Sequence, residues 1–289
     1  PPVQLILHRG FTTIKYMRKF VKYWICMMVG IMLFIMFPAG GDNRNEKNFL
    51  PEGELPELII GSDEYEPYNY QDENGKPAGI DVEIAVEACR RMGYAPVFKK
   101  IPWEQKNDYL ESGKVDCLWG CFTMTGREND YDWAGPYLHS SQVIVVAKDS
   151  DIRTLQDLAG KRISVQATSK PEEVLLYGDD PRIPEVQTVY SMSTMEELYA
   201  SLRKEYTDAI AGHKSALNTF VQSDPGAYRM LDQSLYISEL GVAFQKGTDT
   251  RLAEKLTDTL QEMQTDGTMQ KILHKYGLES DMIMEDTEP

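Results

Sequence analysis

The residues best suited to chemistry lie close together in residues 121–137, where threonines and one arginine follow a short apolar run. A planar guanidinium such as that of Arg127 can donate two parallel, charge-assisted hydrogen bonds to a carboxylate, which an ammonium group cannot imitate. Aromatic residues occur in the loops after predicted strands, and ligands of α/β proteins collect at the carboxyl ends of strands. The pattern is typical of recognition rather than of catalysis.

Sequence signatures of common enzymes are absent from the chain. It contains no G-x-S-x-G, H-E-x-x-H, G-x-x-x-x-G-K-[ST] or G-x-G-x-x-G motif, so hydrolase, metalloprotease and nucleotide-enzyme functions have no support. Cys117 and Cys121 are four residues apart, a spacing that matches neither metal knuckles nor redox pairs. We interpret both, with Cys89, as small buried apolar residues, and we expect no metal, no cofactor and no catalytic residue.

Composition is that of an ordinary globular protein with an uneven charge distribution. The 289 residues are 42% apolar and 26% charged. Residues 1–41 contain five basic residues and no acidic ones, which leaves 25 basic against 45 acidic residues, a net charge of −20, in the rest. Such an acidic surface argues against binding to nucleic acid or to anionic lipid.

The basic start leads into a run of fifteen predominantly apolar residues, 23–37, followed by small residues, which is the layout of an export signal. We assign residues 17–41 to a signal peptide. An uncleaved anchor through residues 23–37 is the alternative, although a membrane-spanning helix needs about 20 apolar residues. Residues 1–16 lack methionine and are expected to be a gene-prediction artefact, and residues 42–55 a polar linker. We therefore expect an exported protein at the cell surface, extracellular or periplasmic.

From residue 56 onward, predicted strands and helices alternate, as in α/β proteins with largely parallel sheets. The first long helix has Asp81 as its expected cap and Gly93 as its expected end. A later helix is predicted to begin with a capping box formed by Ser193 and Glu196. Seven or more alternations in about 225 residues exceed one modest sheet, so we expect two lobes.

Five segments carry a family pattern in order: YEPYNYQDENGKPAGIDVEIAVEACRRMG, ESGKVDCLWGCFTMTGRENDYDWAGPY, QVIVVAKDSDIRTLQDLAGKRISVQA, TDAIAG and LGVAFQKGTD...DGTMQKILHKYG. Over residues 56–277 the chain resembles the extracellular solute-binding proteins of family 3, which serve ABC importers for polar amino acids. The resemblance implies an α/β fold of the type II periplasmic-binding class. Two lobes, each a mainly parallel sheet flanked by helices, are joined by two hinge strands and close over the ligand.

On this chain the resemblance implies a first lobe from residues 56–145 and 243–277, a second lobe from 146–242, and an acidic tail from 278–289. The implied partners are a small amino-acid-like ligand and an ABC transporter permease in the membrane, with no nucleic acid and a monomeric protein.

The family pattern also implies ligand-binding residues. Its Y-x-P-[FY] aromatic falls on Tyr65, and the aromatic before its second helix falls on Trp103, so these two are implied to enclose the ligand. The alternative is ordinary core packing. Its [ST]-x-T-x-x-R pattern assigns Thr123 and Arg127 to the ligand α-carboxylate, next to Cys121.

Two further positions follow from the same comparison. The family usually has two residues between its last threonine and the arginine, whereas here only one residue separates Thr125 from Arg127. The alternative to a ligand-binding Arg127 is therefore a plain surface arginine. The family's V-Q-A-G-[ST] segment falls on residues 165–169, and Ser169 precedes a helix whose first N–H groups suit a carboxylate. A helix N-cap with no ligand role is the alternative there.

The clearest departure from the family is His213, which stands where an aspartate usually holds the ligand ammonium. A neutral imidazole can accept one hydrogen bond, but the charge pairing is lost. Either another acid such as Asp63 or Glu64 takes the ammonium, or the ligand lacks an ordinary α-amine.

Three functions remain open from the sequence. The first is a binding protein that captures an amino acid or a related zwitterion for an importer. The second is the extracellular sensor of a transmembrane signalling protein. The third is an enzyme on the same scaffold, similar to cyclohexadienyl dehydratases, with His213 as the histidine facing the cleft.

Overall fold

The computed structural model describes residues 55–248 and 250–278, whose strands form one mixed sheet of nine strands and a separate two-stranded ribbon. The main sheet has the order β4-β1-β5-β11-β6-β9-β7-β8, and β10 pairs with β6. The expected signal peptide or anchor, the gene-prediction artefact, and nearly all of the linker and the acidic tail lie outside the described residues.

The first lobe is the part of the sheet around β1, which is parallel to both of its neighbours. Each strand here is followed by a loop at the same edge of the sheet, as parallel pairing requires. Its strands are β1 (Glu57–Ser62), β4 (Ala95–Lys100), β5 (Cys117–Leu118) and the ribbon β2 (Tyr70–Gln71) with β3 (Pro77–Ala78). Its helices are α2 (Ile80–Met92), η1 (Trp103–Gln105), α3 (Lys106–Glu111), α7 (Thr250–Thr265) and α8 (Thr268–Lys275).

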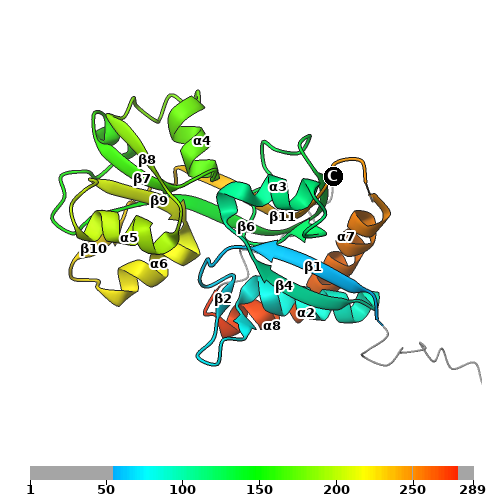
Figure 1. Cartoon of the computed structure of the whole chain (residues 1–289). Helices are drawn as coiled ribbons and strands as arrows, with labels where there is room; N and C mark the ends of the chain where they lie inside the picture. The colour runs from blue at the N-terminus through cyan, green and yellow to red at the C-terminus, as the bar shows by residue number, and fades with distance from the viewer. Residues whose placement is uncertain (1–54, 249, 279–289) are drawn as a thin grey trace, which may run out of the picture. The chain divides into compact units, whose positions relative to one another are not determined.

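Two long antiparallel strands are shared by both lobes. β6 (Asp132–Ala147) pairs with β11 (Tyr236–Phe244) along the first lobe and then with β9 in the second. Gln142 lies at the changeover, because it is opposite Tyr236 on one side and His213 on the other. Figure 1 shows both strands running between the two groups of elements. The expected lobe boundaries at 145/146 and 242/243 fall within these strands and stay a prediction.

The second lobe surrounds β7, which is parallel to β8 and β9. Its strands are β7 (Arg162–Gln166), β8 (Thr188–Met192), β9 (Ala209–His213) and β10 (Tyr228–Met230). Its helices are η2 (Leu155–Leu158), α4 (Lys170–Tyr177), α5 (Met195–Arg203) and α6 (Lys214–Ser223).

Apolar cores hold the strand ends in place. In the first lobe the apolar face of α2, including Ile84 and Ala88, packs with Leu256 and Leu260 of α7, and all four are almost fully buried. In the second lobe Ile163 and Val165 of β7 pack in a separate cluster. Each fully buried isoleucine, leucine or valine side chain contributes about 1.5–3 kcal/mol to folding.

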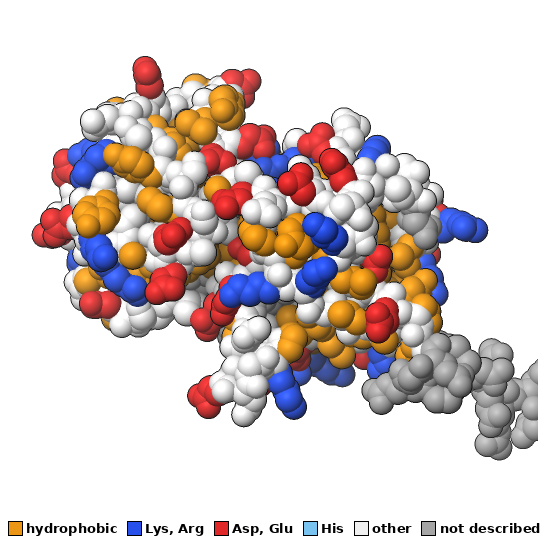
Figure 2. Space-filling view, viewed as in Figure 1, with side chains coloured by type: hydrophobic (Ala, Val, Ile, Leu, Met, Phe, Trp, Pro, Cys, Tyr) orange, Lys and Arg blue, Asp and Glu red, His pale blue; other side chains and the backbone are white. Residues whose placement is uncertain are grey.

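On the surface, carboxylate and basic side chains are interspersed over the face that Figure 2 shows.

Two helix starts differ from the sequence prediction. The residue before α2 is Gly79, so Asp81 is not the cap; it lies in the first turn and is 1% exposed. The capping box of α5 uses Thr194 and Glu197, one residue later than predicted. Gly93 does end α2, in the left-handed conformation. No helix within the described part of the chain is both long and apolar enough to cross a bilayer.

Candidate functional site

All seven residues predicted to contact a ligand line one cavity, and they come from both lobes. They are Tyr65, Trp103, Cys121, Thr123, Arg127, Ser169 and His213. Each lies just beyond, or at, the carboxyl end of a strand: β1, β4, β5, β7 or β9. The cavity therefore occupies the position where ligands collect in α/β proteins. Their roles in binding stay a prediction.

Arg127 lies at the cavity with its side chain 13% exposed. Its guanidinium nitrogen Nη2 is 3.1 Å from Glu173 Oε2 of α4, and its Cζ is 5.6 Å from the centre of the Phe122 ring. The other oxygen of Glu173 accepts a hydrogen bond from Lys170 Nζ at 2.6 Å. Arg127 and Lys170 thus both bind the carboxylate of Glu173, each at one of its two oxygens.

Two lysines add positive charge in and beside the cavity of Arg127. Lys170 also lines the cavity and is 6% exposed. Lys106, at the start of α3, is 5% exposed and donates to Thr168 Oγ1 at 2.7 Å. Burial and then the nearby Arg127 lower the pKa of Lys106 to about 8, so it is still mainly protonated at pH 7.

Aromatic rings form two walls of the cavity. Trp103 meets Phe122 edge to face with ring centres 5.0 Å apart. Tyr65 meets His213 in the same way at 5.8 Å, and its hydroxyl accepts the backbone N–H of His213 at 3.3 Å. Tyr65 and Trp103 are each 5% exposed. They serve as core residues and as cavity lining at once, so the two sequence interpretations are not exclusive.

His213 is held in a network of neutral groups. Its Nδ1 is 2.8 Å from Ser140 Oγ, and the amide nitrogen of Gln142 lies 2.9 Å from Nε2. Burial, with a smaller effect of Arg127, lowers the pKa of His213 to about 3, so the ring is neutral at pH 7. A neutral imidazole has one hydrogen-bond donor and one acceptor, and Ser140 and Gln142 already bond to its two nitrogens.

Gln142 offers an acceptor that the sequence did not suggest. Its side chain is fully buried and lines the cavity, and its Nε2 also donates to Ser238 Oγ at 3.1 Å. Its Oε1 is buried with no hydrogen-bond partner in the described part of the chain. A buried carbonyl without a donor is costly, so a ligand N–H that reaches Oε1 is favoured.

Cys121 occupies a strained position that Asp81 supports. Cys121 has φ 50°, the left-handed region that non-glycine residues rarely adopt. Its N–H donates to Asp81 Oδ2 at 2.6 Å, and Tyr137 donates to the other oxygen at 2.9 Å. Burial raises the pKa of Asp81 to about 7 and the pKa of the Cys121 thiol well above its usual value. Asp81 therefore positions the loop that leads to Thr123 and Arg127.

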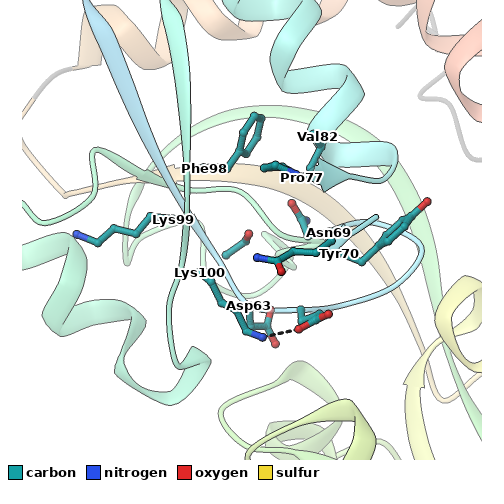
Figure 3. A pocket seen from close by; sticks show the side chains of 11 residues that line it. Asp63, Asn69, Tyr70, Pro77, Val82, Phe98, Lys99 and Lys100 are labelled. Atoms are coloured by element: carbon teal, nitrogen blue, oxygen red, sulfur yellow. Dashed lines mark hydrogen bonds and ion pairs between the residues drawn. The ribbon is translucent and has the colours of Figure 1, made fainter. Parts of the chain in front are cut away.

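Neither acid suggested as a partner for a ligand ammonium lines this cavity. Asp63 accepts a hydrogen bond from Gln166 Nε2 at 2.5 Å, and burial raises its pKa to about 6. It lies beside a neighbouring pocket of the first lobe, with Lys100 (Figure 3). Glu64 pairs with Lys100. No carboxylate side chain is among the residues that line the cavity.

Hydrogen bonds across the cavity join the lobes, so the structure is in a closed arrangement. The pairs include Asp63 with Gln166, Lys106 with Thr168, Arg127 with Glu173, Tyr65 with His213, Tyr68 with Ser215, and Glu104 with Ser193. Ser169 is the N-cap of α4, accepting from the N–H of Glu172, and also lines the cavity.

Comparisons with known proteins agree with this architecture. Residues 58–279 match the bacterial extracellular solute-binding proteins, family 3. The chain is 28% identical to the L-cystine-binding protein TcyJ of Escherichia coli over 250 residues, 80% of this chain and 88% of the relative. It is 27% identical to the histidine-binding periplasmic protein of Escherichia coli over 233 residues, 77% and 88% of the two chains.

A solved structure of an ancestral arginine-binding protein bound to arginine superposes with a TM-score of 0.69 and 29% identity, covering 76% of this chain and 97% of that one. The expected fold class, two α/β lobes joined by two hinge strands, is confirmed by these likenesses.

Proposed function

Because the chain belongs to the bacterial extracellular solute-binding proteins of family 3, we propose that it binds an amino acid or a related zwitterion between its lobes. It then presents this ligand to the permease of an ABC importer. The observation that supports this most is the convergence of residues from five strand ends on one cavity that contains a buried guanidinium. The relatives named above bind cystine, histidine and arginine.

In this function Arg127 binds the ligand α-carboxylate, with hydroxyl groups from Thr123 and Ser169 on either side. The two hydroxyls come from different lobes, so a carboxylate between them is fully coordinated only in the closed form. Charge-assisted hydrogen bonds in a desolvated cavity are worth more than the same bonds in water.

The ligand ammonium is held by neutral acceptors in this proposal. Gln142 Oε1 has no protein partner in the described residues and lines the same cavity. The aromatic walls, Tyr65 and Trp103, exclude water and pack against the carbon atoms of the ligand.

Closure couples binding to presentation. The interlobe hydrogen bonds are few, and the pair of Arg127 with Glu173 is partly exposed, so the closed form needs the ligand to become dominant. A permease can then distinguish loaded from empty protein by the lobe arrangement. We expect a monomer, exported to the cell surface or the periplasm.

The experiment is a thermal-shift screen of the purified protein against the twenty amino acids, cystine, organic acids and polyamines, followed by calorimetry on the hits. A ligand present at 1,000 times its Kd adds about 4 kcal/mol to the stability and raises Tm by several degrees. Stabilisation by one or a few amino acids supports the proposal. A protein that no amino acid stabilises, while another solute class does, contradicts it.

A further inference from the structure

Lys106 is a buried cation that makes no direct ion pair in the described part of the chain, although the charges of Asp63 and Glu172 act on it from a greater distance and raise its pKa. Its side chain is 5% exposed, and its Nζ lies 5.1 Å from the centre of the Trp103 ring and 5.8 Å from that of Phe122. Both rings line the ligand cavity. Among residues 55–248 and 250–278 no carboxylate lies within ion-pairing distance of Nζ, and its hydrogen bond goes to Thr168 Oγ1.

The two carboxylates whose charges act on this amine, Asp63 and Glu172, accept hydrogen bonds from other groups and do not contact Nζ directly. Asp63 accepts from Gln166, and Glu172 accepts from the N–H of Thr168 and from Ser191. Glu173 bridges Arg127 and Lys170. The cavity lining itself contains two cationic side chains and no carboxylate.

A buried ammonium with one neutral partner is an expensive feature. Removing such a charge from water costs several kcal/mol unless an anion or several acceptors replace the water. The surrounding rings compensate partly, since a cation over an aromatic face gains about 0.5–2 kcal/mol. An anionic ligand group beside Trp103 supplies the missing partner.

We propose that the ligand is an amino acid with a second anionic group in its side chain, and that Lys106 is the residue that selects it. This inference rests on the proposed function. The α-carboxylate binds at Arg127, the ammonium at Gln142 Oε1, and the side-chain anion reaches Lys106 past the Trp103 and Phe122 rings. Two positive side chains, Arg127 and Lys170, line a cavity without a lining carboxylate, and Lys106 lies against its Trp103 and Phe122 rings. This arrangement favours a ligand that carries more than one anionic group.

The competing explanation is that Lys106 only fastens the lobes, through Thr168 of the second lobe. A fastening residue contributes the same free energy to the closed complex of every ligand. A selecting residue contributes only when the ligand carries the second anion. The two explanations therefore differ in the ratio of affinities for matched acid and amide ligands.

The test measures Kd by calorimetry for glutamate against glutamine and for aspartate against asparagine, pairs of similar shape that differ in charge. The parent protein is expected to bind the better of the two acids at least about tenfold more tightly than its amide. Lys106→Met is expected to weaken acid binding by about tenfold or more and amide binding by less than about threefold. Lys106→Arg, which keeps the charge, is expected to retain the preference for the acid.

Lys114→Met is the matched control, because Lys114 is an exposed lysine over the Tyr109 ring, away from the cavity. Its affinities should equal those of the parent. A parent that prefers the amides or a basic amino acid overturns the inference and leaves the proposed function intact. Equal weakening of acid and amide by Lys106→Met overturns it in favour of the fastening role. A parent that binds neither an amino acid nor a related zwitterion refutes the proposed function itself.

Discussion

The replacement of Arg127 by alanine is expected to weaken ligand binding strongly while leaving the fold intact. The guanidinium is 13% exposed, so a carboxylate that binds it is largely desolvated. Truncating one partner of such a buried pair costs about 2–5 kcal/mol. At about 1.4 kcal/mol per tenfold change, Kd rises by about 30-fold to several thousandfold.

The effect on stability should be much smaller. Without ligand, Arg127 pairs with Glu173, whose side chain is 41% exposed, and a pair of this exposure contributes at most about 1 kcal/mol. Urea unfolding of the ligand-free Arg127→Ala variant should therefore give a free energy within about 1 kcal/mol of the parent. Arg127→Lys keeps the charge but loses the planar fork, so its Kd should lie between those of parent and alanine variant.

The assay is calorimetry with the best ligand from the thermal-shift screen. Arg90→Ala is the control, since Arg90 forms an exposed pair with Glu87 on α2. Its Kd should match that of the parent. A rise in Kd of less than about tenfold for Arg127→Ala refutes the reasoning, because a desolvated carboxylate without its partner cannot be that well accommodated.

Four further variants test the supporting structure. A Cβ at Gly79, where φ is 122°, lies 2.2 Å from the carbonyl oxygen of Tyr68, so Gly79→Ala should cost more than about 3 kcal/mol in urea unfolding. Gly75→Ala, with φ 75° and open space around its Cβ, should cost only about 1–2 kcal/mol. Asp81→Ala removes the acceptor of three buried donors, Cys121 N–H, Tyr137 O–H and Asn69 Nδ2–H, and should cost about 2–5 kcal/mol; a loss below 1 kcal/mol contradicts this. The pKa of His213 is 6.5 in the unfolded chain and about 3 in the folded one, so the unfolded chain takes up the proton first as the pH falls. The stability that goes with the buried neutral ring is therefore fully present above pH 6.5 and is lost as pH falls toward 3. Relative to His213→Gln, the parent should lose about 1.4 kcal/mol of unfolding free energy per pH unit between pH 6 and 4, and parallel curves would exclude a buried neutral imidazole.

The seven site residues named from the sequence came from the family resemblance, carried over residue by residue, and all of them line one cavity. Arg127 and Tyr65 follow strands β5 and β1, and a guanidinium or an aromatic ring in such a loop is informative by itself. The order of βα elements also predicted the two lobes. These features depend on short segments of the chain, which sequence patterns describe well.

The residues that the sequence did not predict depend on contacts between distant segments. Lys106 and Lys170 look like ordinary helix lysines in the sequence, but Lys106 packs over the Trp103 and Phe122 rings and bonds Thr168, and Lys170 lies over Tyr236. Asp81 resembles an N-cap, but it faces Cys121, forty residues later, and serves as an anchor for that loop. Gln142 follows three polar residues of β6, His139, Ser140 and Ser141, so its type and position alone did not mark it as functional.

Two strands have a local sequence pattern that does not predict them. β6 begins at Asp132 and pairs with β11 although Gly135 and Pro136 interrupt it. The edge strand β8 alternates only weakly, because both of its faces are partly exposed. Both cases show tertiary pairing overriding local propensity.

The most direct measurement is a crystal structure of the protein with the tightest ligand from the screen. The ligand is predicted to lie between the lobes, with a carboxylate oxygen about 2.7–2.9 Å from an Arg127 nitrogen and a ring of Tyr65 or Trp103 against its carbon atoms. A ligand bound in the wider opening beside Glu104 and Tyr199, or on the surface, with Arg127 still paired only to Glu173, would contradict the account.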